Sequence, residues 1–341
     1  MAKLRLVGLL SCVLLTAITV NCPGVVATGA GFMSQAASAQ GLPSGIPTRR
    51  PFPPVPRPPT HVDYGSVIDQ EIDACGPVNY NPFTQGFTGF GCQIQIPAGV
   101  FIIDTPIRLQ SGVSLVGEGR GATILKLGTG VNKSVIQIGT NKVETGPFSW
   151  VNFLSYINIE HLSIDGNAPN QSQPTYAIHL ASAGFVTVRD VRIANVNSHG
   201  IVADNGSLVN DEGAGLRVGT LRLEDIDMVV APAGFLPDSY GGAPVGIYLF
   251  GAADSWISRV QINGSSAMYA DLYIRDCGSM MVSDNTFSGG GQTTSVAVGG
   301  NNDHISLHDN YFDSEAKVLN PNWVPISNVE PYSCVDCNIK Q

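Results

Sequence analysis

A strand-like segment with alternating apolar and polar residues recurs in the second half of the chain. Each copy has an apolar residue at its third position and another five residues later. Successive copies begin 25 to 35 residues apart and are separated by runs containing Gly, Asn and Asp. A repeat of this length built of strand residues is typical of a β-solenoid, in which every repeat forms one coil. The copies begin at Ile157, Val186, Leu221, Ser255, Met280 and Ile305.

A second strand with period-two alternation precedes the later copies, so its residues face inward and outward in turn. Coils of a solenoid stack about 4.8 Å apart, and equivalent residues therefore align into ladders. The inward residues are aliphatic, among them Ile201, Ile247 and Leu272, and they predict the core. The outward residues form two files: His179, Val202, Tyr248, Tyr273 and Ala297, and then Ala181, Asp204, Phe250, Arg275 and Gly299.

Asp and Asn recur at adjacent positions in the middle of the repeated segment. Their side chains can satisfy backbone donors in turns, so we expect them to build the turns rather than to carry out catalysis. These residues are Asp190, Asp225, Asp284 and Asp309 at one position, and Asn285 and Asn310 at the next.

A short amphipathic helix is predicted before the repeats. Ser66 is a candidate N-cap, and Ile68, Ile72 and Cys75 share one face. An open solenoid end exposes strand edges and core, so we expect this helix to cap the first coil.

Composition agrees with a protein of many strands and turns, with 39 Gly, 22 Pro and only 13% charged residues. The net charge of −9 argues against a nucleic-acid partner, because neutralising phosphates requires clustered Lys and Arg. A polyanionic glycan would need a local basic patch or a bridging cation.

The N-terminus has the pattern of a signal peptide. Lys3 and Arg5 precede the apolar stretch 6–20, which is short for a membrane span. Cleavage is expected after Ala39, with Ala27 as a nearer alternative and a retained signal as the third possibility. We therefore expect residues 1–39 to be a signal peptide and the protein to be secreted to the extracellular space or periplasm, with no membrane contact after cleavage.

Residues 40–62 are rich in proline and predict a semi-rigid linker. Export to an oxidising compartment permits disulfides, and Cys75–Cys92 is the pair that we favour. The remaining cysteines of the exported chain are Cys277, Cys334 and Cys337, and the last two form a CxxC pair in which a disulfide or free thiols are expected rather than a metal site.

The segment IPAGVFIIDTPIRLQSGVSLVGEGRGATI (96–124) resembles the first coil of the pectate-lyase-like superfamily, and the turns at Asn285 and Asn310 resemble its generic repeats. The resemblance implies an all-β fold, a right-handed parallel β-helix over 63–315, with the short N-terminal capping helix and a C-terminal capping tail at 316–341. Members of this superfamily include polysaccharide lyases, hydrolases, epimerases and spike-like proteins, so the fold alone does not fix the reaction.

Candidate chemistry lies on the outward files and in the turns that follow them. The candidate catalytic residues are Asp204, Arg275, Asp276 and Asp254, and the candidate substrate-binding residues are His179, Tyr248, Tyr273 and His199. Aromatic rings stack on sugar rings, while Asp and Arg can bind hydroxyl or carboxylate groups.

Two reactions are compatible with these groups. Hydrolysis of a glycosidic bond requires a pair of carboxyl groups, which Asp204, Asp254 and Asp276 can supply. β-Elimination from a uronate, by resemblance to the lyases, uses Arg275 as base and Ca²⁺, for which Asp204 and Asp271 are the candidate ligands. No other cofactor is expected.

The sequence therefore predicts an exported enzyme, a lyase or glycoside hydrolase, that degrades or modifies an extracellular polysaccharide. The alternative is a non-catalytic β-helix surface protein that binds glycans or has a structural, spike-like role. Oligomeric state is not predicted.

Overall fold

The computed structural model describes residues 61–76, 91–139, 154–181, 183–204, 218–230, 244–265, 268–288, 294–300 and 302–312, together with the backbone of six further short strands. The predicted signal peptide lies outside the described residues. No helix within the described ranges is long and apolar enough to cross a membrane.

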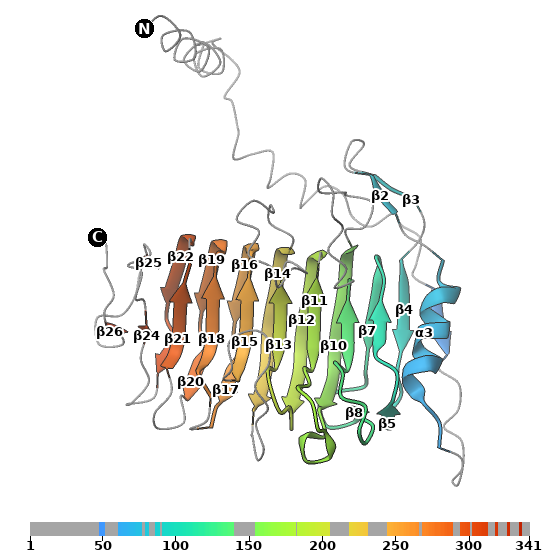
Figure 1. Ribbon diagram of the computed structural model, residues 1–341. Helices are drawn as coiled ribbons and strands as arrows, with labels where there is room; N and C mark the ends of the chain where they lie inside the picture. The colour runs from blue at the N-terminus through green and yellow to red at the C-terminus, as the bar shows by residue number, and fades with distance from the viewer. Residues whose placement is uncertain are drawn as a thin grey trace, which may run out of the picture. The chain divides into compact units, whose positions relative to one another are not determined.

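Two parallel sheets form the molecule from Pro47 onward, and their strands alternate along the chain (Figure 1). The first sheet has 15 strands, with the order β1-β4-β7-β10-β12-β14-β16-β19-β22-β25 along its main path. Its strands are β1 (Thr48–Pro51), β4 (Cys92–Gln95), β5 (Gly99–Ile103), β7 (Val113–Val116), β8 (Thr123–Leu127), β10 (Leu154–Asp165), β12 (Ala183–Ala194), β14 (Val218–Val229), β16 (Ala252–Ser258), β17 (Gln261–Asn263), β19 (Gly278–Ser283), β20 (Thr286–Ser288), β22 (Asp303–His308), β23 (Tyr311–Phe312) and β25 (Ile326–Ser327).

The second sheet has nine strands, in the order β26-β24-β21-β18-β15-β13-β11-β9-β6. Its strands are β6 (Ile107–Leu109), β9 (Ile136–Ile138), β11 (Ile178–Ala181), β13 (Ile201–Asp204), β15 (Val245–Phe250), β18 (Ala270–Arg275), β21 (Thr294–Gly299), β24 (Val318–Leu319) and β26 (Cys334–Val335). Each coil contributes strands to both sheets, and several coils add a second short strand to the first sheet, such as β8, β17 and β20, which is the arrangement of the predicted right-handed parallel β-helix. A separate hairpin joins β2 (Asn79–Asn81) to β3 (Gly86–Thr88), and a 3-10 turn covers Ala168–Asn170.

The six repeated segments are the rungs of the first sheet; each follows one corner in the left-handed region and contains a second such corner between its two apolar positions. The corner residues have φ between 45° and 61°, although none is glycine. Asp tolerates this conformation better than most residues, which explains its recurrence at the second corner. The first corner consists of Tyr156, Phe185, Thr220, Asp254, Ser279 and His304, and the second of His161, Asp190, Asp225, Arg259, Asp284 and Asp309.

The two asparagines after the second corner form a buried ladder, as their repeat position predicts. The backbone N–H of Val260 donates to Asn285 Oδ1 at 2.9 Å, and Asn285 Nδ2 donates to the Ile257 carbonyl at 3.0 Å. Asn310 Oδ1 in turn accepts from the backbone N and from Nδ2 of Asn285. Each amide therefore satisfies backbone groups inside the turn. Aliphatic ladders fill the remaining interior, and Ile201, Ile247 and Leu272 are fully buried.

The predicted capping helix is α3 (Tyr64–Ala74), which lies at the β4 end of the coils (Figure 1). Its N-cap is Asp63, not Ser66: the N–H of Gly65 donates to Asp63 Oδ1 at 3.0 Å. Asp63 also accepts from the backbone N–H of Asp104 and Thr105, so it joins the helix to the first coil, a contact that local sequence does not reveal.

The predicted disulfide between Cys75 and Cys92 is confirmed. It joins the C-terminal end of α3 to the first residue of β4. Cys277 is a free, buried thiol. Within the predicted linker, Thr48–Pro51 forms β1 and pairs with β4, and within the predicted tail β24, β25 and β26 extend both sheets.

Candidate functional site

The outward face of the second sheet brings the predicted side chains into register. His179 is paired with Val202, Val202 with Tyr248, and Tyr248 with Tyr273 across β11, β13, β15 and β18. The neighbouring file pairs Phe250 with Arg275. Both alignments were expected from the repeat.

Much of this face is buried, although the alternation placed its side chains on the outside of the coil. His179 and Asp204 are each 3% exposed, and Tyr248 is 2% exposed. Val202, Val245 and Tyr248 form a hydrophobic cluster outside the main core, against which Tyr176, Phe250 and Tyr273 pack. The accessible end of the face lies around Tyr273 and Arg275, which are partly exposed.

A buried His–Asp pair lies at the β11–β13 end of this face. His179 Nε2 is 3.0 Å from Asp204 Oδ2, and both side chains are almost completely enclosed. A carboxylate hydrogen-bonded to an imidazole fixes the orientation of the ring. The pair therefore has a defined geometry at this end of the face.

Aromatic rings connect this pair to the accessible end of the face. Tyr176 stacks on His199 with 5.7 Å between ring centroids, His199 stacks on Tyr248 at 5.6 Å, and Tyr248 meets Tyr273 edge to face at 5.3 Å. Tyr269, which is 40% exposed, continues the series beyond Tyr273. His199 is held in place because its Nδ1 accepts the Val245 N–H at 2.8 Å.

Sequence reasoning did not identify Tyr176 and Tyr269 as members of this series. Both lie one or two residues before their strands begin, where period-two alternation assigns no direction to a side chain. The available signal was their position: each precedes a strand that contributes an aromatic residue to the outward file.

Arg275 is the basic group at the accessible end of the face. Its guanidinium lies over the Phe250 ring at 5.1 Å, and its Nε is 3.3 Å from Asp276 Oδ2. Desolvation lowers the pKa of Arg275, but the nearby Tyr248 and Tyr273 hydroxyls and Asp276 outweigh it, and the net pKa is raised. Arg275 therefore stays a cation.

Tyr248 has a pKa raised to about 12, chiefly by burial, which the positive charge of Arg275 offsets only in part. The phenol is consequently protonated at neutral pH and can act as a hydrogen-bond or proton donor.

The remaining predicted carboxylates occupy different surroundings. Asp276 follows β18 in a left-handed turn beside Arg275, whereas Asp254 is exposed at the first corner. Asp271 is fully buried at the start of β18, and burial raises its pKa to about 8 despite the neighbouring Ser295 hydroxyl. Within the described part of the chain, no three His, Cys, Asp or Glu side chains are grouped to hold a metal ion.

Solved structures with related coils agree on the fold. The N-terminal fragment of bacteriophage Phi29 gene product 12 is 14% identical, with a TM-score of 0.51 over 79% of this chain and 44% of that one. The surface protein and adhesin PfbA of Streptococcus pneumoniae is 13% identical, with a TM-score of 0.51 over 79% and 69% of the two chains. A tailspike protein mutant of the E. coli bacteriophage HK620, solved with a pentasaccharide, is 14% identical, with a TM-score of 0.50 over 82% and 50%.

Sequence similarity relates the chain to one named protein and to one family. A protein of Cochliobolus carbonum named glucan 1,3-beta-glucosidase is 24% identical over 217 residues, which are 60% of this chain but only 25% of that protein. The chain thus spans about a quarter of that relative. Residues 63–241 match the family described as rhamnogalacturonase A/epimerase, pectate lyase-like. Because this match covers more than half of the sequence, the chain belongs to the pectate-lyase-like rhamnogalacturonase A/epimerase family.

Proposed function

We propose that the protein is an exported carbohydrate-active enzyme that acts on an extracellular polysaccharide through the outward face of the second sheet. The observation that carries the proposal is the line of groups on that face: a buried His179–Asp204 pair at one end, stacked rings, and Arg275 beside Tyr248 at the other. Family membership supports the substrate class, and the disulfide is compatible with an oxidising compartment.

Arg275 is assigned to binding rather than to proton abstraction. A base must lose its proton near the working pH, and the raised pKa of Arg275 prevents this. A guanidinium that lies over the Phe250 ring and close to tyrosine hydroxyls is instead suited to bind a sugar carboxylate by charge-assisted hydrogen bonds. Tyr273 and Tyr269, at the accessible end, would stack on the sugar ring.

Proton donation is assigned to Tyr248, which interacts with Arg275 and remains protonated, so it can donate a proton to a departing glycosidic oxygen. His179 and Asp204 lie on β11 and β13, three and two coils from Arg275, and are almost fully enclosed, so they are assigned to positioning the ring series rather than to proton abstraction. Asp276, beside Arg275, is the candidate base for the proton next to the sugar carboxylate. A bound carboxylate, a base and a phenol at one end of the face favour β-elimination from a uronate. Hydrolysis requires carboxyl groups on either side of the scissile bond, and Asp204 is enclosed and engaged by His179.

Purified protein incubated with acidic and neutral polysaccharides tests the proposal. Ultraviolet absorbance of unsaturated uronates marks elimination, whereas new reducing ends without that absorbance mark hydrolysis. Arg275→Gln and Tyr248→Phe should each reduce activity by about a hundredfold or more, because each removes a group that acts in the transition state. Asp309→Asn, at an exposed corner of the first sheet and outside the candidate site, is the matched control and should retain activity. Unchanged activity in both test variants would overturn the assignment.

The burial of His179 and Asp204 supports a second candidate, a glycan-binding β-helix without catalysis. Such a protein would retain oligosaccharide binding at Arg275 and release no product from any polysaccharide in the panel. Export is tested separately, by detecting the protein outside cells of its native host and by loss of that fraction when residues 1–39 are removed.

A further inference from the structure

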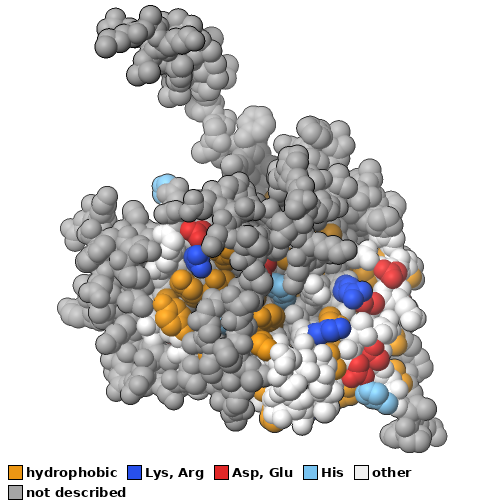
Figure 2. Space-filling view, viewed as in Figure 1, with side chains coloured by type: hydrophobic (Ala, Val, Ile, Leu, Met, Phe, Trp, Pro, Cys, Tyr) orange, Lys and Arg blue, Asp and Glu red, His pale blue; other side chains and the backbone are white. Residues whose placement is uncertain are grey.

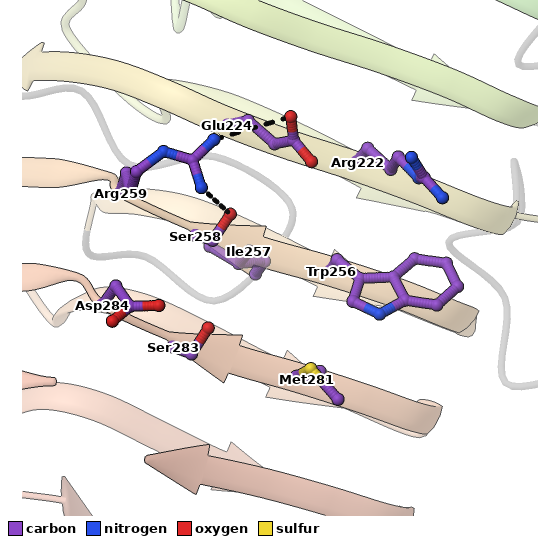
Figure 3. Close-up of a pocket in the computed structure, with 9 residues that line it drawn as sticks. All are labelled: Arg222, Glu224, Trp256, Ile257, Ser258, Arg259, Met281, Ser283 and Asp284. Atoms are coloured by element: carbon purple, nitrogen blue, oxygen red, sulfur yellow. Dashed lines mark hydrogen bonds and ion pairs between the residues drawn. The ribbon is translucent and has the colours of Figure 1, made fainter. Parts of the chain in front are cut away.

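A shallow hollow of about 290 Å³ lies on the first sheet, on the strands β14, β16 and β19 and outside the ring series described above (Figure 3). Three side chains from successive coils form one row across it, because Arg222 is in register with Trp256 and Trp256 with Met281. Met281 is 42% exposed, which is unusual for a large apolar side chain, and Trp256 is partly exposed. The row therefore presents an apolar surface flanked by a cation.

A second row of polar side chains runs parallel to the first, two residues further along each strand. Glu224 is in register with Ser258, and Ser258 with Ser283. Equivalent residues in successive coils repeat about every 4.8 Å, close to the length of one sugar residue in an extended chain. A glycan running along the coils would thus meet apolar atoms on one side and hydroxyl or carboxylate groups on the other.

The two arginines of the hollow differ in their partners. Arg259 is neutralised: its Nε and Nη2 donate to the Asp225 carboxylate at 2.7 and 3.0 Å, and Glu224 lies 3.7 Å away. Arg222 is exposed and lies over the Trp256 ring at 5.2 Å, and it makes no ion pair with any residue that the structure describes. On the face seen in Figure 2, both acidic and basic side chains are visible.

We propose that this hollow is a second, non-catalytic binding site for an acidic oligosaccharide. A pyranose ring packs on Trp256 and Met281, and its carboxylate pairs with Arg222. The hydroxyl groups of the sugar are bound by Ser258, Ser283 and Glu224. The site lies on a different sheet from Arg275, so it does not depend on the proposed catalytic function.

Calorimetric titration in an Arg275→Gln background, which removes the carboxylate partner on the second sheet, isolates binding at the hollow. The probes are a galacturonate tetrasaccharide and the same tetrasaccharide after reduction of its carboxyl groups. The acidic probe should bind more tightly than the reduced one, and the preference should weaken as salt is added.

Substitutions then locate the binding. Trp256→Ala should raise the dissociation constant of the acidic probe by about tenfold or more. Arg222→Gln should abolish the preference for the acidic probe while retaining the folded circular dichroism spectrum, which keeps the test valid if Trp256→Ala does not fold. Thr187→Ala, one coil before Arg222 in the same outward file, is the matched control and should bind like the parent.

Equal binding of the two probes, or no change on Arg222→Gln, would overturn the proposal. The outcomes remain distinguishable from those of the catalytic proposal: loss of activity in Arg275→Gln with retained probe binding supports both sites. Retained activity in Arg275→Gln with loss of binding in Trp256→Ala refutes only the catalytic assignment.

Discussion

Replacing the buried Asp271 by Asn should make the protein more stable at neutral pH. The Asp271 carboxyl group is fully enclosed, and neither oxygen makes a hydrogen bond of normal geometry with a described residue. The polar group beside it is the Ser295 hydroxyl, on the next coil. The site is tightly packed, because Asp271 and Met268 leave no room for a side chain at Gly264. Ionising such a group is costly, so its pKa rises to about 8 in the folded protein, with desolvation as the cause.

The magnitude follows from proton linkage. In the unfolded chain the group titrates near its model value of 3.8, so between that pH and about 8 only the unfolded state loses the proton. The stability associated with the protonated acid is complete below 3.8 and declines as the pH rises toward about 8, above which it is constant. At about 1.4 kcal/mol per pH unit, the loss is roughly 1.5 kcal/mol at pH 5 and roughly 4 kcal/mol at pH 7.

Urea unfolding of the parent and of Asp271→Asn at several pH values between 4.5 and 8.5 measures this loss. The amide has nearly the same shape but no charge, so the variant should lack this component of the pH dependence, and the gap between the two proteins should widen as the pH rises. Asp254→Asn, at an exposed corner, is the control and should follow the parent. A gap that stays constant over the whole range would refute the claim that Asp271 is protonated in the folded state.

Other predictions concern the turns and the cap. Asn310→Ala removes one acceptor, which takes two hydrogen bonds, and one donor from the buried amide ladder. It should cost about 2–4 kcal/mol of unfolding free energy, measured by urea denaturation, and a loss below about 0.5 kcal/mol would contradict the ladder. Cys92→Ser opens a covalent link between residues 17 apart and should cost about 3 kcal/mol, and a reductant should destabilise the parent but not the variant. Thr220→Asn should raise the melting temperature because a β-branched residue at φ 45° is strained, with a gain of about 1 kcal/mol; a lower melting temperature would argue against strain at this corner.

The solenoid could be predicted in some detail because stacking converts sequence period into spatial register. The files through Tyr248 and Arg275 follow directly from counting residues between repeats, and the parallel pairing of β15 with β18 reproduces them. The Asn285 and Asn310 ladder is predictable for the same reason. The cap itself is local, since Asp63 accepts from Gly65, and Asp is a favoured N-cap residue. The bonds that Asp63 also makes to Asp104 and Thr105, about 40 residues away in the chain, could not be predicted.

Burial of the outward face could not be predicted from the same pattern. Period-two alternation distinguishes the inside of the coil from the outside, and it assigned His179 and Asp204 to the outside correctly. It contains no information on what else packs against that outside surface, and both side chains are almost fully enclosed. Asp271 is a further example. A charged residue at the start of a strand is expected at the surface, but the structure buries it completely.

The two outward faces of the solenoid differ in how far their polar groups are shielded from water, and this distinguishes a face suited to proton transfer from a face suited to binding. On the second sheet, His179, Asp204 and Tyr248 are withdrawn from water, and desolvation has moved the pKa of Tyr248 well above its usual value. On the first sheet, Arg222, Trp256 and Met281 remain accessible, and the hollow has no buried ionisable group among its lining residues. Proton transfer depends on groups with perturbed pKa values held in a fixed geometry, whereas holding a chain requires only accessible surface and charge. We therefore expect catalysis on the second sheet and substrate retention on the first. On both faces, a glycan would run parallel to the direction in which the coils stack.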